Sequence, residues 1–133
     1  MLGPREVFDR FQQATLAGTI GFDDLAEDVV IEWPFAPGGP ARVEGRSEFV
    51  AFATPSRQAL PVRFDEFRDV VVHETADPEV VVAEYTLVGT HLPSGRELAA
   101  PFVMVLRVRD GELVFCREYQ NPLAMAEAAA LAS

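Results

Sequence analysis

The sequence predicts an α+β fold in which a curved antiparallel sheet packs on N-terminal helices and encloses one pocket. Three observations support this prediction. The length of 133 residues suits a single domain. Helical periodicity occurs in the first half of the chain, whereas strand-like segments joined by short turns fill the second half. Helices that are separated along the chain from an antiparallel sheet are typical of the α+β class.

The chain is predicted to begin with two helices. Residues 3–18 carry apolar side chains at steps of three and four, which indicates the first helix. Pro4 is tolerated in its first turn, and Gly18 provides a stop signal. A short second helix is expected over residues 21–26, after which the chain should enter the sheet.

The middle of the chain is predicted to contain a strand, a loop and a helix. Residues 28–33 are rich in β-branched side chains and predict the strand. The prolines and glycines of residues 34–40 exclude regular structure and predict a loop at the pocket mouth. Ser47 is the expected N-cap of a third helix over residues 47–54.

Four long strands are expected in the second half, because β-branched and aromatic residues recur there between turn signals. They span residues 61–73, 79–91, 97–108 and 113–119. Asp110-Gly111, between the last two strands, is typical of a tight hairpin. The alanine-rich residues 122–133 are predicted to form a C-terminal helical tail, within one domain that spans residues 1–133.

The charge of the chain excludes several kinds of partner. With 11 basic and 21 acidic residues, the net charge is −10 and no basic stripe is present to neutralise phosphates. We therefore expect no binding to nucleic acid or to anionic membrane surfaces. The apolar runs are too short for a membrane helix, and charges near the N-terminus argue against a secretory leader. A cytoplasmic location is expected.

The sequence carries few of the motifs that identify cofactor or metal sites. No His/Cys/carboxylate cluster indicates a metal, and no glycine-rich loop indicates a phosphate site. Cys116 is the single cysteine, which excludes an internal disulfide. Because no histidine stands at a recognisable spacing from it, Cys116 is interpreted as a small buried hydrophobic residue rather than a nucleophile.

The last predicted strand divides its side chains between two faces of the sheet. Cys116, Glu118 and Gln120 share one face by alternation, and Phe115, Arg117 and Tyr119 share the other. Alternation alone leaves two roles open for Glu118. It could face a pocket, or it could be a solvated residue or a partner of Arg117 or Arg107.

Four stretches of the sequence carry a resemblance to a known superfamily. They are residues 7–11, residues 28–35, residues 43–46 with the helix that follows, and residues 106–113 running into residues 117–122. On these residues, in this order and spacing, the chain resembles the SnoaL-like polyketide cyclases and ketosteroid-isomerase-like proteins of the NTF2-like superfamily. The resemblance implies an NTF2-like cone (a cystatin-like α+β roll) with one apolar pocket per subunit. It also implies a homodimer, an apolar small-molecule partner and no cofactor.

The resemblance also implies a chemistry, in which a pocket carboxylate removes a proton next to a carbonyl group. The positions of the ketosteroid isomerase machinery hold Phe11, Trp33 and Met104 here. None of these side chains can replace the tyrosine and two aspartates of that machinery, so the standard isomerase reaction is not expected. The SnoaL-like cyclases instead place their base on the last strand, where this chain has Glu118. Their polar partner on the penultimate strand is replaced by Met104.

Glu118 is therefore the predicted catalytic base. Apolar surroundings should raise its pKa, and a raised pKa suits a base that works near neutral pH. Tyr85 is a further catalytic candidate that could donate to an enolate oxygen, with amphipathic packing as its alternative. His91 could bind a ligand or act as an acid, but its place beside a turn favours an exposed position. The residues predicted to contact the ligand are Phe11, Trp33, Phe35, Phe52, Met104, Cys116 and Gln120.

Three functions remain open from the sequence. The first is a SnoaL-like enzyme that uses Glu118 on a polycyclic or otherwise apolar carbonyl substrate in cyclase- or isomerase-type chemistry. The second is a non-catalytic protein that binds an apolar small molecule, which the replacements at Phe11 and Met104 favour. The third is a dimerisation module whose convex sheet face, including Val103, Arg117 and Tyr119, makes the contact.

Overall fold

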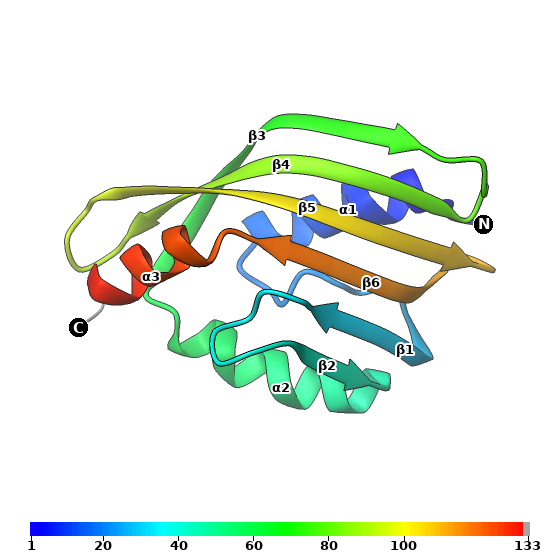
Figure 1. The fold of residues 1–133 in the computed structure, drawn as a ribbon, viewed down its shortest axis with the longest axis horizontal. Coiled ribbons are helices and arrows are strands. Elements are labelled where there is room, and N and C mark those ends of the chain that lie inside the picture. The colour runs from blue at the N-terminus through cyan, green and yellow to red at the C-terminus, as the bar shows by residue number, and fades with distance from the viewer. Residues whose placement is uncertain (132–133) are drawn as a thin grey trace.

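The computed structural model describes residues 1–131, so the last two residues of the predicted tail lie outside the described part. Three helices and six strands follow one another along the chain (Figure 1). Their order is α1 (Pro4–Leu16), β1 (Leu25–Trp33), β2 (Ala41–Glu44), α2 (Arg46–Ala59), β3 (Val62–Glu74), β4 (Val80–His91), β5 (Glu97–Arg109), β6 (Glu112–Gln120) and α3 (Pro122–Leu131).

The six strands form one curved sheet in the order β2-β1-β6-β5-β4-β3. The α+β prediction is confirmed, but the prediction of a purely antiparallel sheet is wrong, since β1 and β6 run parallel, with Ile31 opposite Cys116. The chain leaves β2 through α2, enters the sheet again at its far edge and returns through hairpins. Whether β6 runs parallel or antiparallel to β1 depends on the path that the chain takes through α2. This path cannot be predicted from local sequence patterns.

The predicted second helix does not form. Residues 21–24 make an irregular turn instead, and β1 already begins at Leu25. Gly21 has a φ of 98°, and a Cβ atom at this position would lie 2.8 Å from the Phe11 ring. A glycine is therefore needed for the chain to pass this close to α1, and the close passage takes the place of a helical turn.

The region before α2 also differs from the prediction. Residues 41–44 form the short strand β2, which pairs with β1 and was not expected. Helix α2 begins one residue before Ser47, its N-cap is Gly45, and no side chain caps its first turn. It continues to Ala59, five residues beyond the predicted end. By contrast, the predicted hairpin at Asp110-Gly111 forms, and both residues have the positive φ values that such a turn needs.

The hydrophobic core lies on the concave face of the sheet. Helix α1 packs there against β3, β4, β5 and β6, and Figure 1 shows it behind β4 and β5. Helix α2 covers β1 and β2, while α3 contacts β5. Phe8 of α1, Leu106 of β5 and Leu113 of β6 are fully buried between these layers. In residues 1–131, no helix has both the length and the apolar character that a bilayer crossing requires.

Candidate functional site

A cavity of about 370 Å³ lies between the concave face of the sheet and helices α1 and α2. This volume is at the lower end of the range of about 300–1,000 Å³ that is common for small-molecule sites. Aromatic side chains supply most of its wall. They are Phe11, Phe22, Trp33, Phe49, Phe52, Phe64, Tyr85 and Phe102. Such a lining favours an apolar ligand with flat surfaces.

Glu118 is the acidic side chain of this wall. Strand β6 alternates as predicted, so that Cys116, Glu118 and Gln120 all line the cavity. Arg117 points to the other face, where its Nε donates to Glu32 at 2.9 Å. Arg107 pairs with Asp77 and Glu79. Neither arginine is therefore the partner of Glu118.

Tyr85 of β4 is the hydrogen-bond donor beside Glu118. Its hydroxyl group donates to Oε2 of Glu118 at 3.4 Å, a long hydrogen bond. The ring is buried, and it stacks on Phe102 with ring centroids 5.4 Å apart. Phe67 and Phe8 pack against it at 4.9 and 5.7 Å. These neighbours restrain the ring and so hold its hydroxyl group toward the carboxylate.

The two groups differ strongly in how readily they ionise. Burial raises the pKa of Glu118 to about 7, although hydrogen bonds from Tyr85 and Trp33 oppose part of that rise. Burial also raises the pKa of Tyr85 well above its ordinary value, and the nearby Glu118 carboxylate adds to this effect. Near neutral pH, Tyr85 therefore remains a protonated donor while Glu118 exchanges between its two forms.

Four of the predicted ligand contacts line the cavity together with Glu118 and Tyr85. They are Phe11, Trp33, Phe52 and Gln120. Cys116 also lines the cavity, but only 1% of its surface is accessible and burial raises the pKa of its thiol well above the ordinary value. Its interpretation as an unreactive buried residue agrees with this environment.

Two predicted ligand contacts lie elsewhere. Met104 stands opposite Glu118 in the β5–β6 register, but it is completely buried in the core and does not line the cavity. Alternation predicts on which face of the strand a side chain lies, but not whether that side chain reaches the cavity or is covered by the core. Phe35 is 54% exposed and packs on Tyr119 at 5.6 Å, on the outer face of the sheet. The turn that follows Trp33, at the end of β1, takes Phe35 out of the alternation of the strand.

His91 is buried, which contradicts the expected exposed position. Only 3% of its surface is accessible, and its Nδ1 lies 2.6 Å from Oγ of Ser94. The following turn folds back on the strand, because the His91 amide donates to the Arg96 carbonyl and the Gly95 amide donates to the His91 carbonyl. His91 does not line the cavity that contains Glu118.

Sequence reasoning missed the polar residues that α2 contributes to the cavity. Ser56 and Arg57 both line it, together with Phe49 and Ala53. The predicted helix ended at residue 54, so neither Ser56 nor Arg57 was placed on its inner face. The spacing of Phe49, Ala53 and Arg57 at steps of four was the available signal. Within residues 1–131, no three His, Cys, Asp or Glu side chains are grouped to hold a metal.

Comparisons with known proteins agree on one family. The family model of the SnoaL-like domain matches residues 5–115. The uncharacterized PhzA/B-like protein PA3332 of Pseudomonas aeruginosa is 40% identical over 100 residues, which cover 74% of this chain and 69% of that protein. A proposed isomerase from Bacillus subtilis has a crystal structure that superposes with a TM-score of 0.84 at 27% identity, covering 96% of this chain and 92% of its own.

A further solved structure is similar in fold. A proposed polyketide cyclase from Pseudomonas putida KT2440 superposes with a TM-score of 0.74 at 21% identity, covering 96% of this chain and 98% of its own. At this identity the likeness concerns the fold alone.

Proposed function

The chain belongs to the SnoaL-like domain family, and from this premise we propose that it is a small cytoplasmic enzyme in which Glu118 acts as a general base. Its substrate is an apolar, polycyclic ketone, and the reaction is of the cyclase or isomerase type. The observation that carries the proposal is a carboxyl group with a pKa of about 7 in an aromatic cavity. A base of that pKa is half ionised at neutral pH. A large fraction is then free to accept a proton, and it binds the proton more strongly than an ordinary carboxylate does.

The proposed reaction begins with proton transfer from carbon to Glu118. A carboxylate oxygen takes a proton from the carbon next to the substrate carbonyl. The C–H electron pair forms a C=C bond, and the π pair of the carbonyl group moves to its oxygen to give an enolate. In a substrate with a further C=C bond beside that carbon, return of the proton to the far carbon of the dienolate gives an isomer. Alternatively, attack of the enolate carbon on a second carbonyl group closes a ring, and the resulting alkoxide takes the proton back from Glu118. Tyr85 orients the carboxylate through its hydrogen bond to Oε2.

The pH dependence of proton transfer tests this proposal. We expect the protein to release deuterium from 2,2-dideuterio-1-tetralone, a neutral bicyclic ketone, faster than buffer alone. The enzymatic rate should rise with pH and level off above an inflection at about 7, because only ionised Glu118 accepts a proton. Mass spectrometry of the recovered ketone measures the rate. An enzymatic rate that does not vary between about pH 5 and pH 9 would contradict Glu118 as the base.

A non-catalytic binding function is the second candidate. The observation that favours it is Met104, which provides no polar donor on β5 opposite Glu118. A binder would bind 1-tetralone without accelerating deuterium release at any pH. The same assay, combined with a binding measurement by calorimetry, therefore separates the two functions.

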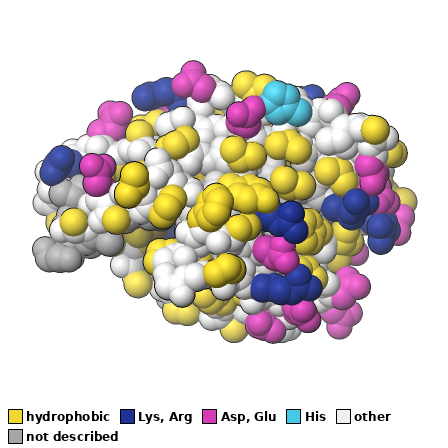
Figure 2. Space-filling view, in the orientation of Figure 1, with side chains coloured by type: hydrophobic (Ala, Val, Ile, Leu, Met, Phe, Trp, Pro, Cys, Tyr) yellow, Lys and Arg dark blue, Asp and Glu magenta, His cyan; other side chains and the backbone are white. Residues whose placement is uncertain are grey.

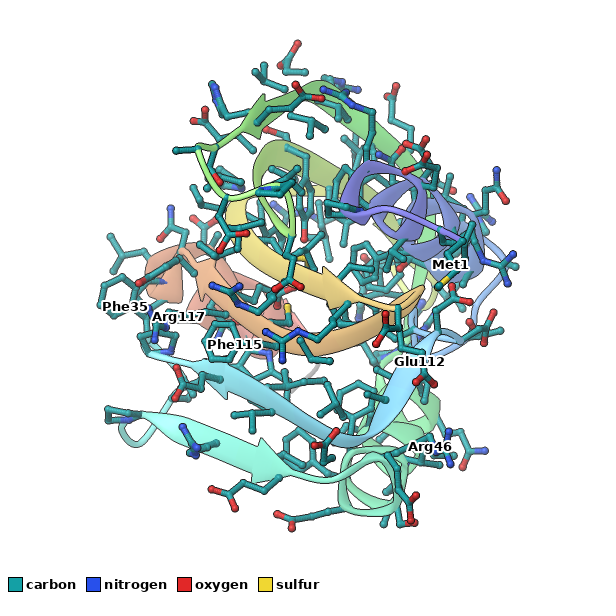
Figure 3. The ribbon with its side chains drawn as sticks, turned by 90° about the vertical axis from the view of Figure 1, so that its right-hand side faces the viewer. Met1, Phe35, Arg46, Glu112, Phe115 and Arg117 are labelled. Atoms are coloured by element: carbon teal, nitrogen blue, oxygen red, sulfur yellow. The ribbon has the colours of Figure 1, made fainter. Side chains whose placement is uncertain are left out.

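We also propose that the protein is a homodimer that associates through the outer face of the sheet. Val103 and Tyr119 are paired on this face and partly buried, and the Arg117 guanidinium lies 5.2 Å from the Phe115 ring centroid. Figure 2 shows hydrophobic side chains gathered over the middle of the face and flanked by charged groups. Phe35, Phe115 and Arg117 lie close together there (Figure 3).

The solution mass tests the dimer. We expect light scattering after gel filtration to give twice the chain mass of 14.6 kDa. Replacing Val103 with aspartate should produce monomers, because a buried unpaired charge opposes association. Leu92→Asp is the control, since Leu92 is 56% exposed in a turn. A wild-type monomer at micromolar concentration would contradict the proposal.

A further inference from the structure

Arg57 is a cationic side chain of the cavity that has no anionic partner among the described residues. It stands in the last turn of α2 and lines the same cavity as Glu118. Its Nε is buried and makes no hydrogen bond within the described part of the chain. Other arginines of this acidic protein, such as Arg107 and Arg117, form ion pairs with carboxylates. Arg46 also forms no ion pair within the described residues, but it does not line this cavity, so what distinguishes Arg57 is an unpaired charge at the cavity wall.

Backbone and aromatic contacts hold the Arg57 guanidinium in place. One terminal nitrogen donates to the Val62 carbonyl at 3.1 Å, and the other lies 3.5 Å from the Leu60 carbonyl. The guanidinium carbon lies 4.8 Å from the centroid of Phe64, which also lines the cavity. These contacts fix the orientation of the group without neutralising its charge. A group fixed in advance loses little conformational entropy when a ligand binds.

From this geometry we propose that Arg57 binds a carboxylate group of the substrate, so that the substrate is an apolar keto acid. The ketone half of this inference rests on the proposed function of Glu118. Guanidinium groups match carboxylates in shape and charge, and such hydrogen bonds are stronger than neutral ones. The Arg57 side chain is half-buried at the cavity wall, where water is partly excluded and a hydrogen-bonded carboxylate is attracted more strongly than in bulk water. The carboxylate at Arg57 and the C–H bond at Glu118 then fix the orientation of an otherwise apolar molecule.

A purely structural role is the competing explanation. Arg57 links the end of α2 to the start of β3 through the Leu60 and Val62 carbonyls. A positive charge in the last turn of a helix is also favourable in itself. Neither contact, however, requires the charged side chain to line the cavity that contains Glu118. The two explanations differ in whether Arg57 distinguishes an anionic ligand from a neutral one.

Two probes of nearly the same shape make this distinction. 2-Naphthoate carries a carboxylate, and 2-acetylnaphthalene is its neutral methyl ketone counterpart. Their dissociation constants are measured by calorimetry at about pH 6, where naphthoate is ionised and Glu118 is mostly protonated and does not repel it. The wild-type protein is expected to bind naphthoate at least about tenfold more tightly than the ketone.

The expected effect of Arg57→Gln is specific to the anionic probe. The affinity for naphthoate should fall by about 10- to 100-fold, while the affinity for the ketone stays nearly unchanged. Arg57→Lys, which keeps the charge but not the planar fork, should give an intermediate loss. Arg46→Gln is the matched control, because Arg46 begins the same helix, donates to the Leu25 carbonyl at 3.3 Å and does not line the cavity.

Two results would overturn the proposal. An equal loss of affinity for both probes in Arg57→Gln would make Arg57 a structural link, and circular dichroism would show whether the fold is retained. A wild-type protein without preference for naphthoate would also exclude a carboxylate site. Failure of the Glu118 proposal is seen separately, because deuterium release from neutral 1-tetralone does not require Arg57.

Discussion

Replacement of Glu118 by glutamine is expected to slow the release of deuterium from 2,2-dideuterio-1-tetralone by about 100- to 10,000-fold, the usual contribution of a general base. Glutamine has nearly the same shape as glutamate, and its side-chain carbonyl can still accept the hydrogen bond from Tyr85. The cavity should therefore keep its form and its affinity for the ketone. What is lost is the basic oxygen, since an amide does not accept a proton at neutral pH.

Two further variants make this result specific. Glu112→Gln removes a carboxyl group from the same strand, but Glu112 is exposed, so the rate should not change. Tyr85→Phe removes the hydrogen bond that lowers the pKa of Glu118, so the inflection of the pH profile should move above about 7. A Glu118→Gln protein that keeps more than about a tenth of the wild-type rate would refute the assignment of the base.

The position of Glu118 could be predicted from the sequence because strand alternation, which has a period of two, was combined with the resemblance to the SnoaL-like cyclases. Once residues 113–119 are recognised as a strand, Cys116, Glu118 and Gln120 must share a face. The resemblance placed that face toward an apolar pocket, which predicted a raised pKa for Glu118. The prediction needed no knowledge of the neighbouring strand, and it was therefore unaffected by the error in the direction of β6 relative to β1.

The depth and the edges of the cavity could not be predicted in the same way. Phe102 and Met104 stand on the same face of β5, yet Phe102 lines the cavity and Met104 is covered by the core. Which of the two is covered depends on where α1 crosses the sheet, and that crossing is set by tertiary packing. Phe35 lies beyond a strand end, where alternation no longer applies. Arg57 lay beyond the predicted end of its helix, and helix ends are poorly marked in sequence.

Glu118→Gln is also expected to change the stability of the protein in a pH-dependent manner. The folded state holds a proton on Glu118 up to about pH 7, whereas the unfolded chain releases it near the ordinary value of 4.5. The folded state thus binds more protons between these values, and the free energy of unfolding falls as the pH rises through this window. The stabilisation is fully present below the unfolded pKa and is lost once the pH exceeds the folded one.

The size of the effect follows from the two pKa values. At about 1.4 kcal/mol per pKa unit, the contribution of Glu118 should decrease by roughly 2–3 kcal/mol between about pH 5 and pH 8. Glutamine does not titrate, so the stability of Glu118→Gln relative to wild type should increase by that amount over the same range. Urea unfolding, followed by the fluorescence of Trp33, the single tryptophan, measures the difference.

The comparison between the two proteins isolates Glu118 from the other carboxylates. Arginine partners lower the pKa values of Glu32 and Glu79, and the Glu79 backbone amide together with Arg107 lowers that of Asp77. These shifts give the opposite pH dependence, but the groups are the same in both proteins and their effects cancel. Glu112→Gln, which removes an exposed carboxyl group from the same strand, is the control variant measured beside Glu118→Gln. A difference for Glu118→Gln that is constant with pH would mean that Glu118 is not desolvated. If the expected difference is found, the ionised form of Glu118 that can abstract a proton at neutral pH also lowers the free energy of unfolding at that pH. Such a loss of stability is expected of a residue that is retained for its chemistry rather than for its packing.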